Sequence, residues 1–268
     1  MRLIAVFNHK GGVGKTTTVA NLAAALARRG RRVLAVDADP QACLTVHLGI
    51  DLAEPGGSIY EVLTAELPLE QAVRPTEEGG LLLVPSHLDL AGAEMELATT
   101  MARERILRDA VQRYLDAHPE IDYVVFDCPP SLGLLTVNVL VATREVFVPL
   151  QTEYLALRGI SKLLDVVSLA RRRMNPALAI TGILPTLHRQ GTLLGREVRL
   201  EIEKHFGPRV FRTTIRANVR LAEAPSHGKT IFSYAPDSAG AQDYVALADE
   251  VEAMERAVSP PAAASGTA

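Results

Sequence analysis

The sequence predicts an α/β fold, with a mostly parallel central sheet and helices on both of its faces. Short apolar runs rich in β-branched residues alternate along the chain with longer stretches of helical composition, and this alternation is typical of a parallel sheet. Several runs end in aspartate or in glycine-rich loops. Because the carboxyl ends of parallel strands meet at one edge of the sheet, we expect the chemistry at that edge.

The individual elements follow from composition and from the residues that stop them. The expected strands cover residues 2–8, 32–36, 81–85, 123–126, 145–150 and 180–184. The expected helices cover residues 19–29, 59–63, 134–142, 155–173, 195–206 and 237–257, with one long helix or two over 89–117. Residues 1–257 are predicted to form a single domain. Residues 258–268, which are rich in Pro, Ala, Ser and Gly, are predicted to be a disordered tail.

The first strand leads directly into a glycine-rich loop, residues 9–17 with the sequence HKGGVGKTT. Strand, glycine-rich loop, Gly-Lys-Thr and then helix is the order of a P-loop, so the fold is predicted to be that of a P-loop NTPase. Glycines let successive N–H groups point at one anion, Lys15 adds a cation for the outer phosphates, and the Thr16 hydroxyl can ligate Mg²⁺. The usual motif has glycine where His9 stands, and Lys10 adds a second lysine.

Bulk composition excludes several other classes. The net charge of −3 over 268 residues gives no global reason to expect nucleic-acid or membrane binding. The chain has no apolar run of about 18 residues, so no membrane span is expected, and its start does not resemble a signal peptide. Cys43 and Cys128 are the only cysteines, which suggests neither a disulfide framework nor a metal site. We expect a cytoplasmic protein.

Three aspartates follow buried apolar runs and should emerge at the edge that carries the loop: Asp37, Asp39 and Asp127. Alone, each would more simply be a helix cap or a strand-end residue. Together with a P-loop, they provide the hard oxygen ligands that Mg²⁺ requires and a group to hold an attacking water. We therefore expect Asp127 and Asp37 near the metal, with Thr16, and Asp39 positioning the water.

These motifs carry a family resemblance. Residues 10–17 resemble the deviant Walker A motif of the ParA/MinD family of ATPases, and residues 36–41 and 126–131 resemble its second box and Walker B segment. Residues 151–159 and 218–229 are similar to the ParA/Soj chromosome and plasmid partition branch specifically. The matches run from residue 2 to about residue 250.

The resemblance implies an ATP-driven switch with ATP and Mg²⁺ as cofactors and slow, partner-stimulated hydrolysis. It implies an ATP-dependent homodimer in which Lys10 reaches the partner subunit's phosphates and acts in catalysis beside Lys15 and Asp39. It also implies that Pro225 helps to close over the adenine. The expected cofactor-binding residues are Lys10, Gly11, Gly12, Val13, Gly14, Lys15, Thr16, Thr17 and Pro225.

Basic charge is concentrated in one segment. Residues 171–230 carry twelve basic and four acidic residues, a net charge of +8, which leaves −11 for the rest of the chain. Such a surface can hold double-stranded DNA through phosphates without reading bases, although solvated helix faces explain part of it. Members of the branch usually have arginine at the positions of Ala217 and Gly191, so either the arginines are displaced or the DNA surface differs. The DNA-contact candidates are Arg189, Arg216 and Arg220.

The resemblance thus predicts a nucleoid-associated ATPase that segregates or positions DNA, or a large protein assembly, with a ParB-like or other cargo adaptor as partner. Two alternatives remain open. A MinD-like membrane-surface ATPase needs a basic amphipathic C-terminal helix, whereas the last helix here is acidic. A metabolic P-loop enzyme, such as a synthetase or an iron–sulfur reductase, lacks support from paired cysteines or a substrate motif.

Overall fold

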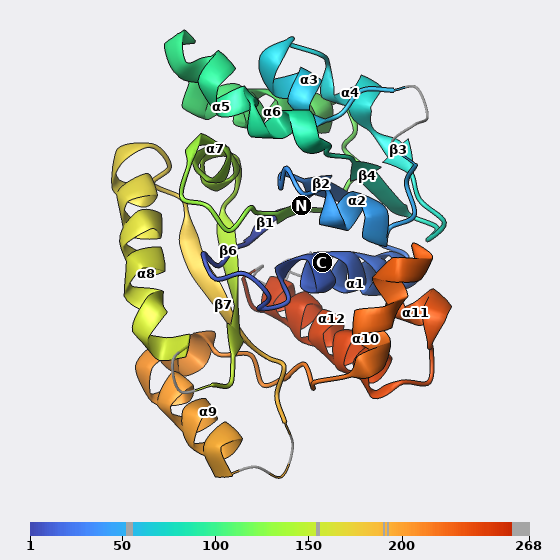
Figure 1. Cartoon of the computed structure of the whole chain (residues 1–268), viewed down its shortest axis with the longest axis vertical. Helices are drawn as coiled ribbons and strands as arrows, with labels where there is room; N and C mark the ends of the chain where they lie inside the picture. The colour runs from blue at the N-terminus through green and yellow to red at the C-terminus, as the bar shows by residue number, and fades with distance from the viewer. Residues whose placement is uncertain (52–55, 154–155, 190, 192, 259–268) are drawn as a thin grey trace, which may run out of the picture.

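The computed structural model describes residues 1–51, 56–153, 156–189, 191 and 193–258. Within them, one sheet runs through the centre of the molecule (Figure 1). Its strands are β1 (Arg2–Val6), β2 (Val33–Asp37), β3 (Arg74–Pro75), β4 (Leu81–Val84), β5 (Tyr123–Asp127), β6 (Glu145–Gln151) and β7 (Ala179–Thr186). Their order is β3-β4-β2-β5-β1-β6-β7, and every pairing is parallel except β3 with β4. The mostly parallel sheet is confirmed.

Helices connect the strands. The α-helices are α1 (Lys15–Arg28), α2 (Cys43–His47), α3 (Ile59–Thr64), α4 (Leu69–Ala72), α5 (Ala93–Glu96), α6 (Ile106–Ala117), α7 (Leu134–Ala142), α8 (Ala156–Arg173), α9 (Leu193–Phe206), α10 (Val219–Glu223), α11 (Ile231–Tyr234) and α12 (Ala239–Val258). The 3₁₀ turns are η1 (Leu88–Ala91), η2 (Leu97–Thr99), η3 (Arg103–Arg105), η4 (Gly207–Arg209) and η5 (Ala224–His227).

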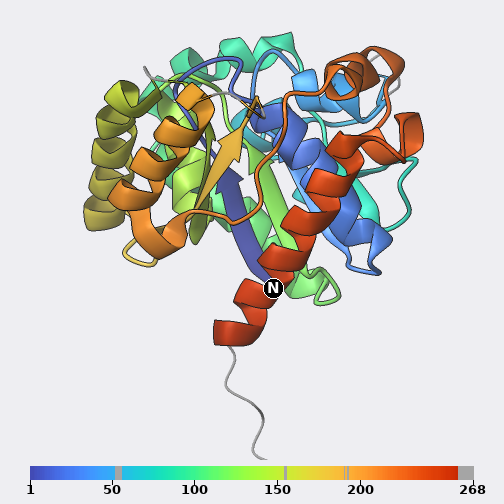
Figure 2. The same cartoon turned by 90° about the horizontal axis from the view of Figure 1, so that it is seen from below.

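Each face of the sheet has its own hydrophobic core, because side chains alternate along a strand. In β1, Leu3 and Ala5 face a core shared with α3, α5, α6, α7, α8 and α9, whereas Ile4 and Val6 face a core shared with α1, α11 and α12. Figure 2 shows α12 lying beside α1 on the second face. The three-layer arrangement holds the carboxyl ends of the parallel strands at one open edge.

Most predicted elements are present within a few residues of their expected bounds. The region 89–117 differs, because it begins with short turns and only its last part forms a continuous helix, α6. The first helix also begins earlier than expected, at Lys15 inside the predicted loop. The sequence did not indicate the antiparallel strand β3, which is only two residues long.

The predicted tail lies outside the described residues except for Val258, which ends α12. No helix in the part of the chain that the structure describes is long and apolar enough to cross a bilayer.

Candidate functional site

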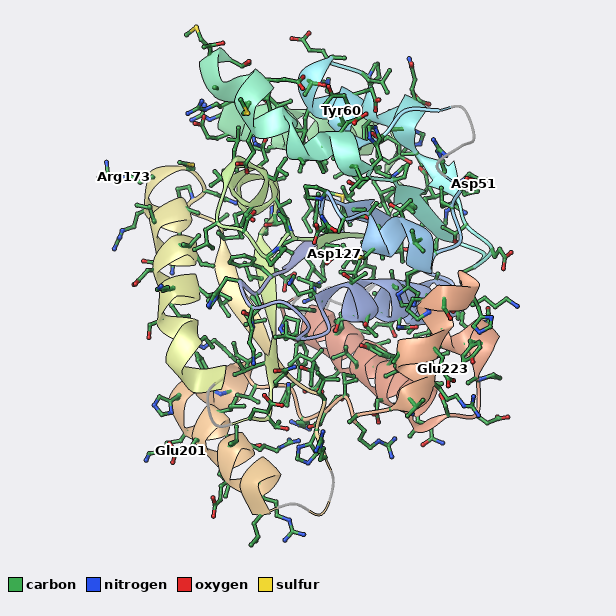
Figure 3. The ribbon with its side chains drawn as sticks, viewed as in Figure 1. Asp51, Tyr60, Asp127, Arg173, Glu201 and Glu223 are labelled. Carbon is green, nitrogen blue, oxygen red and sulfur yellow. The ribbon has the colours of Figure 1, made fainter. Side chains whose placement is uncertain are left out.

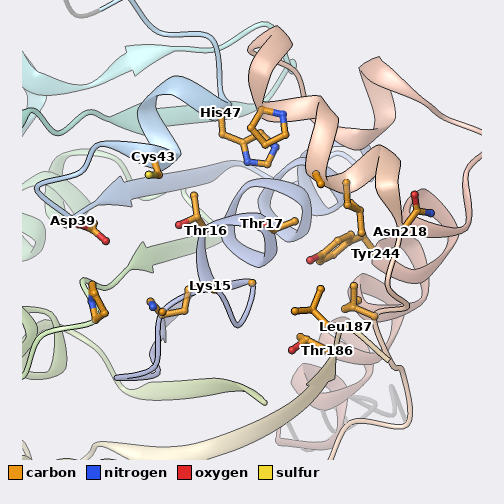
Figure 4. A pocket seen from close by; sticks show the side chains of 18 of the residues that line it. Lys15, Thr16, Thr17, Asp39, Cys43, His47, Thr186, Leu187, Asn218 and Tyr244 are labelled. Carbon is orange, nitrogen blue, oxygen red and sulfur yellow. The ribbon is translucent and has the colours of Figure 1, made fainter. Parts of the chain in front are cut away.

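A pocket of about 470 Å³ opens at the carboxyl edge of the sheet. One end is lined by residues of the glycine-rich loop and by Asp39, and the other by Leu187, Ile215 and parts of α10, η5 and α12. Figure 4 shows Lys15, Thr16 and Asp39 away from Asn218 and Tyr244, which lie toward the opposite end. The pocket therefore has one polar, cationic end and one largely apolar end.

Backbone geometry explains the glycines of the loop. Gly12 and Gly14 have φ of 73° and 88°, in the left-handed region that other residues rarely adopt. Gly14 is the N-cap of α1, so the first N–H groups of this helix face the loop and bring the positive end of its dipole there. Lys15 is 7% exposed, and its Nζ donates to the Lys10 carbonyl at 3.3 Å. These features together create an anion-binding site.

The two lysines of the loop differ in direction. Lys15 lines the pocket, whereas Lys10 does not, and the Lys10 side chain is 45% exposed. Lys10 Nζ donates to Gln151 Oε1 at 2.8 Å and lies 3.8 Å from a Glu153 oxygen. Gln151 also donates to the Gly12 carbonyl at 3.1 Å. Lys10 is thus held at the outer rim of the loop by Gln151, the last residue of β6, and by Glu153 just after it.

The three aspartates meet as the fold class predicts. Asp37 and Asp127 are register partners on β2 and β5, and both are fully buried. Asp37 accepts hydrogen bonds from the Thr45 amide and hydroxyl at 2.9 and 2.7 Å, while Asp39 is 8% exposed and lines the pocket. Burial raises the pKa of Asp37 to about 6, although the Thr45 hydrogen bonds oppose the shift. Burial, and then the charge of Asp37, raises the pKa of Asp127 well above its usual value.

Asp127 lies in the interior (Figure 3), and neither of its carboxylate oxygens has a hydrogen-bond partner among the described residues. The charge of the nearby Lys15 ammonium opposes the rise in the pKa of Asp127 and favours its charged form. Buried, unpaired carboxylate oxygens fit a hard cation such as Mg²⁺, which is usually bound through one or two carboxylates and completes its shell with phosphates and water. Among the described residues, no group of three or more His, Cys, Asp or Glu is arranged so that it could hold a metal ion.

The remaining residues predicted to bind the cofactor lie in the pocket wall or directly behind it. Gly11, Thr17 and Pro225 line the pocket. Val13 is buried, and its carbonyl accepts a hydrogen bond from Thr186 at 2.9 Å, so it shapes the loop from behind. The pocket therefore collects the candidates from the loop, α1 and η5 except Lys10 and Val13.

The three candidate arginines do not form one cluster. Arg216 lines the pocket, and its guanidinium forms an ion pair with Asp243 of α12 at 2.6 Å. Arg220 is exposed and pairs with Glu223 at 2.9 Å, and Arg189 is exposed in the loop after β7. Arg216 is therefore half-buried and already paired, whereas Arg189 and Arg220 are exposed.

Sequence reasoning missed several residues that shape the site. Thr45 holds Asp37, and Gln151 holds Lys10. Asn21 of α1 accepts from the Ile231 amide at 2.7 Å and donates to the Thr17 carbonyl at 2.8 Å, linking α11 to the loop. Tyr244 is almost fully buried at the pocket wall and contacts Thr18. Of these residues, only Gln151 belongs to a stretch that carries the family resemblance, residues 151–159.

The fold and the site define a P-loop protein of the nucleotide-binding α/β class. Residues 1–180 match the family model described as an AAA domain. The chain is 46% identical over 252 residues to the sporulation initiation inhibitor protein Soj of Bacillus subtilis, covering 94% of this chain and 98% of that protein. It is 43% identical to the chromosome partitioning protein ParA of Caulobacter vibrioides, covering 96% of each.

A solved structure described as cobyrinic acid a,c-diamide synthase from Mycobacterium smegmatis, with bound ADP and magnesium, superposes with a TM-score of 0.83. It is 40% identical, and the match covers 96% of each chain. The chain belongs to the ParA/MinD family of deviant Walker A ATPases, on the side of the ParA and Soj chromosome-partitioning proteins.

Proposed function

We propose that this protein is an ATP-driven switch that segregates or positions DNA or a large protein assembly. The observation that carries the proposal is the pair of lysines in one loop: Lys15 lines the pocket, and Lys10 stands at its exposed rim. One lysine can bind phosphates in its own subunit while the other reaches a second subunit. Residues 1–257 would act as one ATPase domain, followed by a disordered tail.

In this proposal, ATP binds with its phosphates on residues 10–17 and its base toward Pro225. Thr16, Asp37 and Asp127 hold Mg²⁺, which neutralises phosphate charge when bound. Asp39, exposed to the pocket, orients the attacking water. Support comes from the orphaned oxygens of Asp127 and from the nucleotide and magnesium bound by the Mycobacterium smegmatis relative.

Two bound nucleotides that face each other repel, so an ATP-bound homodimer requires additional cations between the subunits. Lys10 would supply one from each subunit and would leave Gln151 and Glu153 to do so. Hydrolysis weakens the attraction when the γ-phosphate is lost, which would separate the subunits. This reasoning makes dimerisation depend on ATP.

We further propose that the dimer binds double-stranded DNA non-specifically through the basic segment 171–230, with Arg189 and Arg220 at the surface. Pairing two such segments raises the affinity, so ATP would gate DNA binding. Arg216 would contribute indirectly, since it is paired with Asp243. A ParB-like or other adaptor on the cargo would stimulate hydrolysis and release, and the protein would associate with the nucleoid in the cytoplasm.

The test compares wild type with Lys15→Ala, Lys10→Ala and Asp39→Ala, and uses Lys162→Ala as a control because Lys162 is exposed on α8. Lys15→Ala should weaken ATP binding by about tenfold or more. Lys10→Ala should bind ATP but remain monomeric in light scattering, and Asp39→Ala should stay as an ATP-bound dimer on DNA. DNA retention should need ATP and fall steeply with salt. Dimerisation of Lys10→Ala with ATP at wild-type strength would refute the role of Lys10.

A second candidate function is small-molecule synthesis, because the similar protein from Mycobacterium smegmatis is described as a cobyrinic acid a,c-diamide synthase. The two candidates differ in what should accelerate ATP turnover. If the protein is a DNA-positioning switch, DNA together with an adaptor should accelerate ATP turnover. Cobyrinic acid with an amide donor should then leave the rate of ATP turnover unchanged. Product formation from cobyrinic acid would establish the second function instead.

A further inference from the structure

One buried amide side chain behind the pocket has no role in the function proposed above. Asn21 of α1 is fully buried, and it lies outside the set of residues that line the pocket. Its Nδ2 donates to the Thr17 carbonyl at 2.8 Å, and its Oδ1 accepts from the Ile231 amide at 2.7 Å. Thr17 lines the pocket directly after Thr16, whereas Ile231 begins α11. Asn21 therefore joins the phosphate end of the site to a segment far away in the chain.

That segment, residues 218–234, comprises α10, η5 and α11, and we call it the base-end unit. It supplies these residues to the pocket wall: Asn218, Leu221, Ala222 and Pro225. Its parts are tied together. The Tyr234 hydroxyl of α11 donates to Glu223 at the end of α10 at 3.0 Å, and the Tyr234 ring stacks on His227 of η5 with centroids 4.9 Å apart. The Gly228 amide donates to the Pro225 carbonyl at 3.1 Å. The position of α11 therefore affects where Pro225 lies.

The helix α11 packs against α1 (Figure 1), and two side chains hold its start. Glu78 accepts from the hydroxyls of Thr230 and Ser233, and it pairs with Arg28 at the end of α1, away from the loop. Asn21 lies in the second turn of α1 and is the one of the two that bonds to the loop end of that helix. Asparagine is a poor helix former, so its two hydrogen bonds, rather than helix propensity, explain its place inside α1.

We propose that Asn21 is a positioning residue for nucleotide binding, which sets the distance between the phosphate end and the base end of the pocket. The inference rests on the proposed function, because that function places the base beside Pro225. Asn21 acts through Thr17 and the base-end unit, so it is not a catalytic residue. ATP needs both ends of the pocket at once, whereas an inorganic polyphosphate needs only the phosphate end. Loss of Asn21 should therefore affect these two ligands differently.

The test measures binding of ATP and of inorganic tripolyphosphate, each with Mg²⁺, by calorimetry on the full chain. Asn21→Leu is similar in size and removes both hydrogen bonds. It should bind ATP about tenfold more weakly, with tripolyphosphate binding unchanged. Asn21→Asp keeps a side-chain oxygen that can accept from the Ile231 amide. It should bind ATP within about threefold of wild type.

Asn138→Leu is the matched control, because Asn138 makes the same kinds of hydrogen bond elsewhere. Asn138 is fully buried in α7, and its Nδ2 donates to the carbonyl four residues earlier, that of Leu134, at 3.1 Å. Its Oδ1 accepts from the Leu107 amide of α6 at 3.2 Å. Asn138 does not line the nucleotide pocket. The control should change neither affinity.

Four results would each overturn the proposal. They are equal loss of ATP and tripolyphosphate in Asn21→Leu, wild-type ATP binding in that variant, a loss in Asn21→Asp as large as in Asn21→Leu, and failure of both Asn21 variants to fold. An equal loss of ATP affinity in Asn138→Leu would also contradict it, because general destabilisation would then explain the effect. Wild-type protein that binds tripolyphosphate but not ATP would refute the proposed function, and the inference with it.

Discussion

The buried imidazole of His47 should make the stability of the nucleotide-free protein depend on pH in a way that one substitution removes. Burial lowers the pKa of His47 from 6.5 to about 4, although the Lys229 hydrogen bond opposes the shift. In the unfolded chain the ring takes up a proton below pH 6.5, while the folded protein stays neutral until about pH 4. Acidification therefore favours the unfolded state over this interval.

The magnitude follows from the shift of about 2.5 units, since each unit corresponds to 1.36 kcal/mol. Between pH 7 and pH 5 the His47 contribution should fall by about 2 kcal/mol, and by about 3 kcal/mol at pH 4. His47→Asn leaves no titrating group at this position. The difference in unfolding free energy between wild type and His47→Asn should therefore shift by those amounts, in the direction that disfavours wild type in acid.

Urea unfolding followed by circular dichroism, on both proteins across pH 4–7, measures this difference. Other titrating groups cancel in the comparison, including Asp37 and Asp127, whose raised pKa values act in the opposite direction. A difference that stays constant within about 0.5 kcal/mol would show that His47 is protonated or hydrated in the folded protein. The claim that His47 is buried and neutral in the folded protein would then be wrong.

Three further substitutions test local features. Glu66→Gly should raise the free energy of unfolding by about 0.5–1 kcal/mol, because Glu66 is exposed with φ of 53°; an unchanged melting temperature would count against strain there. Gly228→Ala should cost about 1–3 kcal/mol through positive φ and contact with Gly49, and a stable variant would disprove that approach. Thr45→Val should cost about 1–3 kcal/mol by removing its hydroxyl from Asp37 and from the Ser86 amide, as denaturant midpoints can show.

The candidate site was predictable where residues close in sequence carry its chemistry. Strand, glycine-rich loop and Lys15-Thr16 form one continuous stretch, so their spacing alone indicates a phosphate site. The meeting of Asp37 with Asp127 was also predictable, because both end parallel strands, and the structure makes them register partners. Local order and the geometry of parallel sheets are enough for both inferences.

Only the tertiary structure decided the contacts between residues that are far apart in the chain. No periodicity or motif in the sequence predicts the ion pair of Arg216 with Asp243 or the hydrogen bond that Lys10 donates to Gln151. Such partners come together through the packing of helices and turns, and composition does not predict how these elements pack. The sequence by itself determined the chemistry at the carboxyl edge of the sheet, which is that of a phosphate-binding loop beside buried carboxylates. Packing determined which charges remain available and which are already paired, because pairing depends on distances between elements.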